Sequence, residues 1–148
     1  MSPIPARFPA RFNGIDHVVF KVTDIGRTVD FYKSVLGLHV ERIFDRIGLY
    51  QVRCGVNLID LVQVKAGETL PEPKLRGIEH LCLSIEADLE EVVKSLEKSG
   101  APVFMGPMEV YGAKGFGTSV YIRDPDGYEI ELKVGYARNP VHFSPGAS

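Results

Sequence analysis

The stretch Gly14-Ile15-Asp16-His17 returns in the second half of the chain as Gly77-Ile78-Glu79-His80. The spacing of 80 − 17 = 63 residues marks an internal repeat. A second pair of similar segments carries Asp60 and Glu131 at an offset of 131 − 60 = 71 residues. The chain is therefore built twice, and each half has one histidine and one carboxylate at matching positions.

Composition sets the class of protein. The chain has 148 residues with 45% hydrophobic and 24% charged residues and a formal net charge of −2, which predicts one globular domain over residues 1–148 and excludes a basic surface for nucleic acid. No apolar run approaches the roughly 20 residues of a membrane span, and the first residues lack the apolar core of a signal peptide, so we expect a cytoplasmic protein without a membrane partner. Cys54 and Cys82 are too few for a disulfide framework and are expected to be small buried thiols.

Each half has the pattern of a strand, a helix and three further strands. Apolar runs at residues 16–22 and 80–85 begin the two halves. Asp24 and Asp88 are predicted helix caps, and Gly37 and Gly100 are predicted to end the helices. The turn signal Asp124-Pro125-Asp126-Gly127 joins strands expected at residues 118–123 and 128–134. The predicted boundaries are about 14–64 for module one, 65–76 for a linker, 77–136 for module two and 137–148 for a C-terminal tail.

Alternation along the strands predicts which face carries each candidate ligand. Successive side chains of a strand point to opposite faces of its sheet. If the apolar neighbours of His17, Asp60, His80 and Glu131 pack on the helices, these four side chains point the other way. We therefore expect all four to face one concave surface, where two imidazoles and two carboxylates would form a divalent metal site.

The sequence resembles the vicinal oxygen chelate superfamily, which includes glyoxalase I, bleomycin-resistance proteins and extradiol dioxygenases. The resemblance is carried by four pieces: Ile15-Asp16-His17-Val18, Phe31-Tyr32 before Leu36-Gly37-Leu38, Gly77-Ile78-Glu79-His80, and the segment from Asp124-Pro125-Asp126-Gly127 to Leu132. The stretch around Gly112-Ala113-Lys114-Gly115 is similar to glyoxalase-domain-containing proteins of unassigned activity.

The resemblance implies an α+β fold of two tandem βαβββ modules that form a curved mixed or antiparallel sheet around a metal-binding cleft. It places metal ligands at His17, His80 and Glu131, with a fourth at Asp60. Asp60 is one methylene shorter than the Glu or Gln usual at that position, so it binds the metal directly, through water, or serves as a base. The resemblance also implies a homodimer, in which the site lies within one chain or is completed across the interface.

The donor set suits Zn, Ni, Co, Mn or Fe(II) and does not choose among them. Such a site polarises two neighbouring oxygens of a small substrate and favours proton transfer, because one of Asp60 and Glu131 can stay bound while the other cycles as general base. Glyoxalase-like lyase, isomerase or epimerase chemistry is thus the first expectation. An Fe(II)-dependent extradiol-type dioxygenase and a ligand-sequestering protein of the bleomycin-resistance kind are the alternatives.

Further residues are candidates for catalysis or substrate binding. Tyr121 resembles the tyrosine that contacts the diol in extradiol dioxygenases, although the histidine expected before it is missing here. Tyr50 occupies the equivalent place ten residues before Asp60, with core packing as its alternative role. Lys114 and Arg123 are predicted substrate contacts. Lys114 lies in a glycine-rich segment that is either an added mobile loop or, the interpretation we favour, a flexible hairpin. His39 and His142 are expected to be solvent-exposed.

Overall fold

A computed structural model describes residues 9–12 and 14–135 of the chain, and the predicted tail at 137–148 and His142 lie outside the described residues. The first module contains strands β1 (His17–Val22), β2 (His39–Phe44), β3 (Leu49–Cys54) and β4 (Asn57–Gln63) with helix α1 (Ile25–Ser34). The second contains β5 (His80–Ser84), β6 (Met105–Gly112), β7 (Gly115–Arg123) and β8 (Glu129–Val134) with helix α2 (Leu89–Lys98). Short 3-10 turns at Asp45–Ile47 and Pro73–Leu75 lie in the connections.

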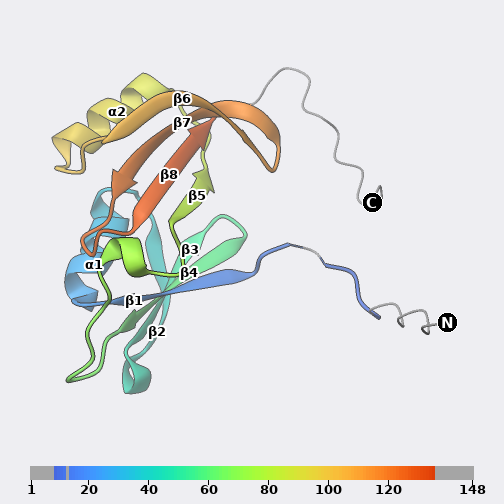
Figure 1. Cartoon of the computed structure of the whole chain (residues 1–148). Coiled ribbons are helices and arrows are strands. Elements are labelled where there is room, and N and C mark those ends of the chain that lie inside the picture. Colours follow the sequence, from blue (N-terminus) through green and yellow to red (C-terminus); the bar gives the residue numbers. More distant parts are fainter. Residues whose placement is uncertain (1–8, 13, 136–148) are drawn as a thin grey trace.

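The strands form two mixed sheets of four, in the orders β1-β4-β3-β2 and β5-β8-β7-β6. Strand β1 runs parallel to β4, and β5 runs parallel to β8. The other neighbouring strands are antiparallel. Figure 1 shows the two sheets as separate units of the same design. The predicted α+β fold of two tandem βαβββ modules is confirmed.

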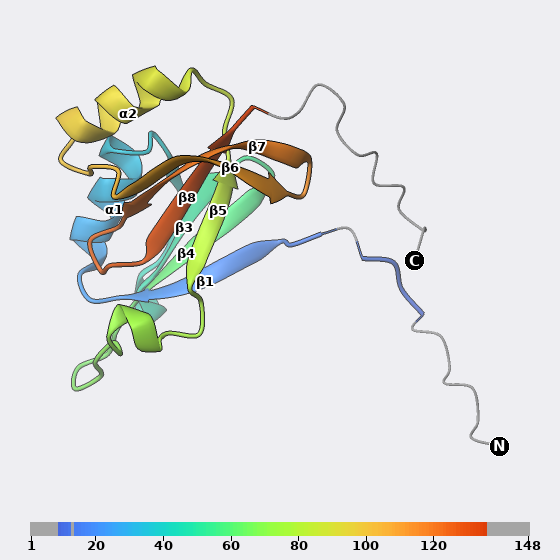
Figure 2. The ribbon, with the colours of Figure 1, turned by 45° about the horizontal axis from the view of Figure 1, so that its top comes forward.

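The helices begin and end where the sequence predicts. Asp24 Oδ1 accepts a hydrogen bond from the Arg27 amide at 2.9 Å, and Asp88 Oδ1 accepts one from the Glu91 amide at 3.1 Å. These bonds satisfy N–H groups that have no partner within the helix. Past the helix ends, Gly37 and Gly100 adopt φ angles of 68° and 78°, the left-handed conformation that favours glycine. Both helices lie on the same side of the molecule (Figure 2).

One hydrophobic core joins the two modules. Its buried members come from both sheets and both modules, namely Phe20, Val22, Tyr32, Val52, Ile59, Leu61, Leu96, Ala101, Val120, Ile122, Ile130 and Leu132. Within each strand these residues alternate with the candidate ligands, which therefore project from the opposite face of the sheet. We call this opposite face the open face; it carries His17 and Asp60 in the first sheet and His80 and Glu131 in the second.

Contacts at the turn before β8 connect the modules directly. The rings of Phe20 and Tyr128 stack with centroids 4.3 Å apart, and the Tyr128 hydroxyl donates to the Lys21 carbonyl at 2.8 Å. The buried Tyr32 hydroxyl donates to Asp124 Oδ2 at 3.1 Å. Each module is thus held through its core face, which leaves the two open faces for other contacts.

The glycine-rich segment is the end of a long hairpin, which is the alternative to a mobile loop that the sequence favoured. Strands β6 and β7 pair as far as Gly112 and Gly115, with only Ala113 and Lys114 in the turn. The extra residues of the second module therefore lengthen two strands, because regular pairing satisfies their backbone N–H and C=O groups. No helix among the described residues is long and apolar enough to cross a membrane.

Candidate metal centre

The second open face brings His80 and Glu131 together. His80 opens β5, Glu131 lies in the middle of the neighbouring β8, and His80 Nε2 is 3.1 Å from Glu131 Oε1. Glu131 is 2% exposed, whereas the His80 side chain retains 35% exposure. A buried carboxylate is costly unless it is paired or bound to a cation, so this pair is the strongest candidate for a metal half-site.

Two hydroxyl groups on β7 fix the Glu131 carboxylate. Ser119 Oγ donates to Oε2 at 2.6 Å, and the Tyr121 hydroxyl donates to Oε1 at 2.8 Å. Burial works to raise the pKa of this carboxyl. Hydrogen bonds from Ser119, Tyr121 and Cys82, together with the nearby imidazole of His80, outweigh burial and hold the pKa below its ordinary value. The arrangement therefore keeps an ionised oxygen donor in a fixed orientation.

Tyr121 and Cys82 stay protonated beside this carboxylate. Burial and the hydrogen bond to Glu131 raise the pKa of Tyr121 to about 12. Burial, followed by the charge of Glu131, likewise raises the pKa of Cys82 to about 12. The Cys82 thiol therefore keeps its proton at neutral pH in the metal-free site. Cys82 is also exposed on the open face, which corrects the expectation that it is buried, whereas Cys54 is partly buried.

The first open face carries a matching half-site with a different support. Asp60 is 5% exposed, and Gln51 Nε2 donates to its two carboxylate oxygens at 3.2 and 3.3 Å. His17 lies on the neighbouring β1, and its side chain is 46% exposed. The hydrogen bond to Asp16, opposed by burial and reinforced by the charge of Asp60, raises the pKa of His17. His17 and Asp60 thus share one electrostatic environment.

Each histidine is oriented by the acid that precedes it. His17 Nδ1 lies 2.7 Å from Asp16 Oδ1, and His80 Nδ1 lies 3.4 Å from Glu79 Oε1. A histidine that binds a metal through one nitrogen usually donates the other N–H to a carboxylate or carbonyl, which fixes its tautomer. This arrangement leaves Nε2 as the candidate metal donor of each histidine. The donor set of imidazole nitrogens and carboxylate oxygens fits a divalent cation, and the repeated acid-histidine pair strengthens that fit.

The structure does not bring the four candidates together within one chain. Among residues 9–12 and 14–135, no group of three or more His, Cys, Asp or Glu side chains lies close enough to hold a metal ion. The four candidates therefore do not share one surface within the described part of the chain, and of the two alternatives this favours a site completed across an interface. The physical reason is the shared core: the two sheets pack through their helix-bearing faces, so that their open faces form two half-sites.

Tyr50 lies on the wrong face for the substrate contact expected of it. In the antiparallel pairing Tyr50 stands opposite Leu61, a fully buried core residue, and Gln51 stands opposite Asp60. Directly paired residues point to the same face, so Gln51 takes the place that Tyr121 has beside Glu131. Tyr50 packs against the core, as its alternative role predicted.

The cavity beside the second half-site contains Lys114 but not Arg123. Its volume is about 320 Å³, and it is lined by residues of the second module only, which include His80, Cys82, Lys114, Glu131 and Lys133. Lys114 thus reaches the predicted region from the hairpin turn. His39, expected to be solvent-exposed, is exposed at the start of β2.

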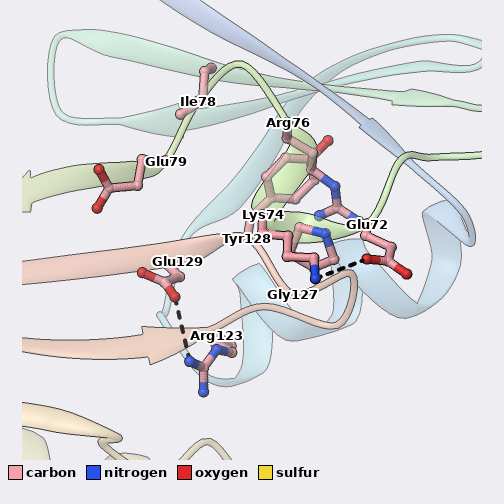
Figure 3. A pocket seen from close by; sticks show the side chains of 10 residues that line it. Glu72, Lys74, Arg76, Ile78, Glu79, Arg123, Gly127, Tyr128 and Glu129 are labelled. Atoms are coloured by element: carbon pink, nitrogen blue, oxygen red, sulfur yellow. Dashed lines mark hydrogen bonds and ion pairs between the residues drawn. The ribbon is translucent and has the colours of Figure 1, made fainter.

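Arg123 lines a different pocket of about 630 Å³, shown in Figure 3 with Glu129, Tyr128 and the Pro73–Leu75 turn. Its guanidinium stacks 3.7 Å from the centroid of the Phe104 ring and lies 3.4 Å from Glu129 Oε1. These contacts, and the separate pocket, place Arg123 outside the cavity of His80 and Glu131. Its contact with substrate stays a prediction, and any such contact would lie in this second pocket.

Three polar residues of the open faces escaped the sequence reasoning: Ser119, Gln51 and Lys133. Strand alternation could have found the first, because Ser119 is two residues from Tyr121 and shares its face. Gln51 was hidden by the one-residue difference between the hairpins of the two modules. Lys133 is 3% exposed, an uncommon position for a lysine, and lies two residues after Glu131 on the same face of β8.

The chain is similar to several known proteins. The chain is 36% identical over 126 residues to virulence protein STM3117 of Salmonella typhimurium, covering 80% of this chain and 81% of that protein. The crystal structure of STM3117 gives a TM-score of 0.67 at 30% identity, covering 86% of this chain and 100% of that one. The glyoxalase domain-containing protein RDO1 of Mycosarcoma maydis is 33% identical over 80% of this chain and 66% of its own length. The metallothiol transferase FosB of Staphylococcus epidermidis is 26% identical over 87% of each chain.

The sequence profile of one family covers both modules. It matches residues 14–132, which include both acid-histidine pairs and both supported carboxylates. The chain therefore belongs to the Glyoxalase/Bleomycin resistance protein/Dioxygenase superfamily.

Proposed function

We propose that this protein is a metal-dependent enzyme that transfers a proton on a small substrate with vicinal oxygens, as a lyase, isomerase or epimerase of the glyoxalase kind. The observation that carries the proposal is the buried Glu131 carboxylate, held by Ser119 and Tyr121 with its Oε1 3.1 Å from His80 Nε2. The name of the relative FosB, a metallothiol transferase, supports metal-dependent chemistry in this superfamily.

We assign His80 Nε2, Glu131 and His17 Nε2 as ligands of a divalent ion, which is Zn, Ni, Co, Mn or Fe(II), with Asp60 next to it. A bound divalent ion would act as a Lewis acid on two neighbouring substrate oxygens. Glu131 is already tied by hydroxyl donors and stays ionised and fixed. The Asp60 carboxylate accepts hydrogen bonds from the Gln51 amide and has no hydroxyl donor like those of Glu131 in the described hydrogen bonds. We assign Asp60 as the base that takes and returns the proton.

Tyr121 completes the assignment as a hydrogen-bond donor. Its pKa of about 12 keeps the hydroxyl protonated at neutral pH, so that it donates to Glu131 and takes no proton there. Its ring also meets the His80 imidazole edge to face, with centroids 5.8 Å apart at 75°. Tyr121 therefore positions both ligands of the second half-site.

The complete site needs two copies of the chain. Because the open faces of one chain hold only half-sites, His17 and Asp60 of one copy would meet His80 and Glu131 of a second copy. Exposed apolar side chains on and before β1 support such a contact, since Val19 is 50%, Ile15 80% and Phe12 83% exposed. Val19 stands beside Asp60 in the parallel pairing, so a partner that covers it would also enclose the carboxylate.

Mixed dimers test this proposal directly. A His17→Ala dimer and a Glu131→Ala dimer should each bind little metal. A heterodimer of these two variants, isolated through two different tags, has one site with all its ligands and one site without His17 and Glu131. It should therefore bind about half the metal of the wild-type dimer, measured per dimer by mass spectrometry.

The alternative arrangements give different results. If each chain held its own site, every site of the heterodimer would lack one ligand, and the metal content would stay low. A wild-type protein that binds no divalent metal after reconstitution would contradict the proposed enzyme and favour ligand sequestration. Bound iron that consumes O2 in the presence of a catechol would contradict proton transfer and favour a dioxygenase.

A further inference from the structure

A buried lysine lies next to the candidate ligands on the same open face. Lys133 is 3% exposed and follows Glu131 by two positions on β8, so strand alternation puts both side chains on one face. Its Nζ donates to the Gly115 carbonyl at 2.7 Å. Burial of an ammonium is unfavourable unless hydrogen bonds or opposite charges compensate it. A lysine in this position therefore needs an explanation beyond packing.

The β6–β7 hairpin is shaped around this side chain. A Cβ added at Gly112 would lie 2.5 Å from Lys133 Nζ, and one added at Gly117 would lie 2.9 Å from Lys133 Cε. The glycines that suggested a mobile loop thus leave room for the ammonium under a regular hairpin. Gly112 is the glycine that the ammonium requires, because at Gly117 an added Cβ would first meet the backbone oxygens of Gly135 and Val134.

The seated ammonium borders the cavity of the second half-site. Lys133 and Glu131 both line the cavity of about 320 Å³, together with His80 and Lys114. Because both side chains border this one cavity, a small molecule held in it can turn its vicinal oxygens toward Glu131 and an anionic end toward Lys133.

We propose that Lys133 binds an anionic group of the substrate, so that the site selects small compounds with vicinal oxygens that also carry a carboxylate or a phosphate. The proposal rests on the proposed function for the position of the vicinal oxygens. The position of the anion rests on the hairpin and the cavity alone.

Three small probes separate these features. Dihydroxyacetone has vicinal oxygens and no charge, whereas hydroxypyruvate adds a carboxylate and dihydroxyacetone phosphate adds a phosphate. Calorimetry on Mn(II)-loaded and on metal-free full-length protein gives the affinity for each probe. In Lys133→Met we expect affinity for the preferred anionic probe to fall by about 10- to 100-fold, the effect of losing a charged hydrogen bond, while dihydroxyacetone binding changes less than about twofold.

A second variant covers the case in which Lys133→Met fails to fold. Gly112→Ala keeps the lysine but places a methyl group where its Nζ lies, so it should weaken the anionic probe selectively as well. Lys94→Met, an exposed lysine on α2, is the matched control and should bind all probes like wild type. The anionic probe that loses affinity in the Lys133 and Gly112 variants shows whether the site prefers a carboxylate or a phosphate.

The outcomes separate the two proposals. If the wild-type protein binds no metal but still prefers anionic over neutral probes, the proposed function is rejected and the role of Lys133 is kept. Equal binding of charged and neutral probes, no binding of any probe, or equal losses in Lys133→Met would overturn the role of Lys133. Selective loss in Lys114→Met, with Lys133→Met unchanged, would move the anion contact to the hairpin turn and overturn it too.

Discussion

The Tyr121 hydroxyl donates a 2.8 Å hydrogen bond to the same Glu131 oxygen that faces His80. The two residues stand directly opposite each other on β7 and β8, so the bond is set by strand register. It holds one carboxylate oxygen in place and leaves the imidazole of the next strand within reach. A ligand that needs no reorientation before binding loses less conformational entropy.

Removal of this hydroxyl should weaken metal binding. In Tyr121→Phe we expect metal affinity to fall by roughly 10- to 100-fold, the usual effect of losing a hydrogen bond that orients a ligand. Competition with a fluorescent chelator measures the affinity. Tyr50→Phe is the matched control, because Tyr50 packs on the core face and should leave metal affinity unchanged. Equal losses in the two variants would contradict the assigned role of Tyr121.

Asp60 and Glu131 should separate into a base and a ligand. Asp60→Asn keeps an oxygen that can accept from Gln51 but cannot take a proton, so metal content should stay near wild type. Exchange of the carbon-bound protons of hydroxypyruvate with D2O, followed by NMR, should slow by about 10²- to 10⁴-fold. Glu131→Gln should lose metal instead. Full exchange activity in Asp60→Asn would remove Asp60 from the mechanism.

The buried carboxyl of Asp124 should make stability depend on pH. Burial raises the pKa of Asp124 to about 6, against hydrogen bonds from the amides of Tyr128 and Asp126 and from Tyr32 that lower it. The folded state therefore binds the proton more tightly than the unfolded state. The resulting stabilisation is complete below about pH 4, the unfolded value, and is lost as pH rises through about 6.

Asp124→Asn removes this dependence. The difference in unfolding free energy, wild type minus variant, should fall by about 2–3 kcal/mol between pH 4 and pH 7.5, measured by urea denaturation. Tyr32→Phe deletes one of the bonds that lower the pKa, so it should move the midpoint of the pH dependence upward. A wild-type minus Asp124→Asn difference that is flat between these pH values would show that the carboxyl is not protonated in this range.

The repeat in the sequence predicted each module well but not how the modules combine. Capping residues, turn signals and alternation are local, and they placed the helices and the ligands on the correct faces. The pairing of Gln51 with Asp60 depends on a turn at residues 55–56, whereas a longer turn at residues 124–128 precedes Glu131. That difference changes the residue that faces the acid from the expected tyrosine to a glutamine.

The separation of the half-sites was equally invisible to local patterns. Amphipathic strands show which face is buried but not which module covers it. The contacts that decide the arrangement join residues far apart in sequence, such as Phe20 with Tyr128 and Tyr32 with Asp124. A packing that brings the four candidate ligands together and a packing that separates them would both satisfy the same alternation of apolar and polar side chains.

Substitution of Gly117 should lower the stability of the fold. A Cβ at this position would overlap the Gly135 carbonyl oxygen and lie 2.8 Å from that of Val134, and neither backbone atom can move without shifting β8. Gly117→Ala should therefore lower the unfolding free energy by about 1–3 kcal/mol, in the range of overpacked cores. Gly77→Ala is the matched control, because a Cβ there meets nothing within 4 Å. Chemical denaturation of both variants measures the difference, and equal midpoints would show that β7 and β8 lie farther apart than the structure has them.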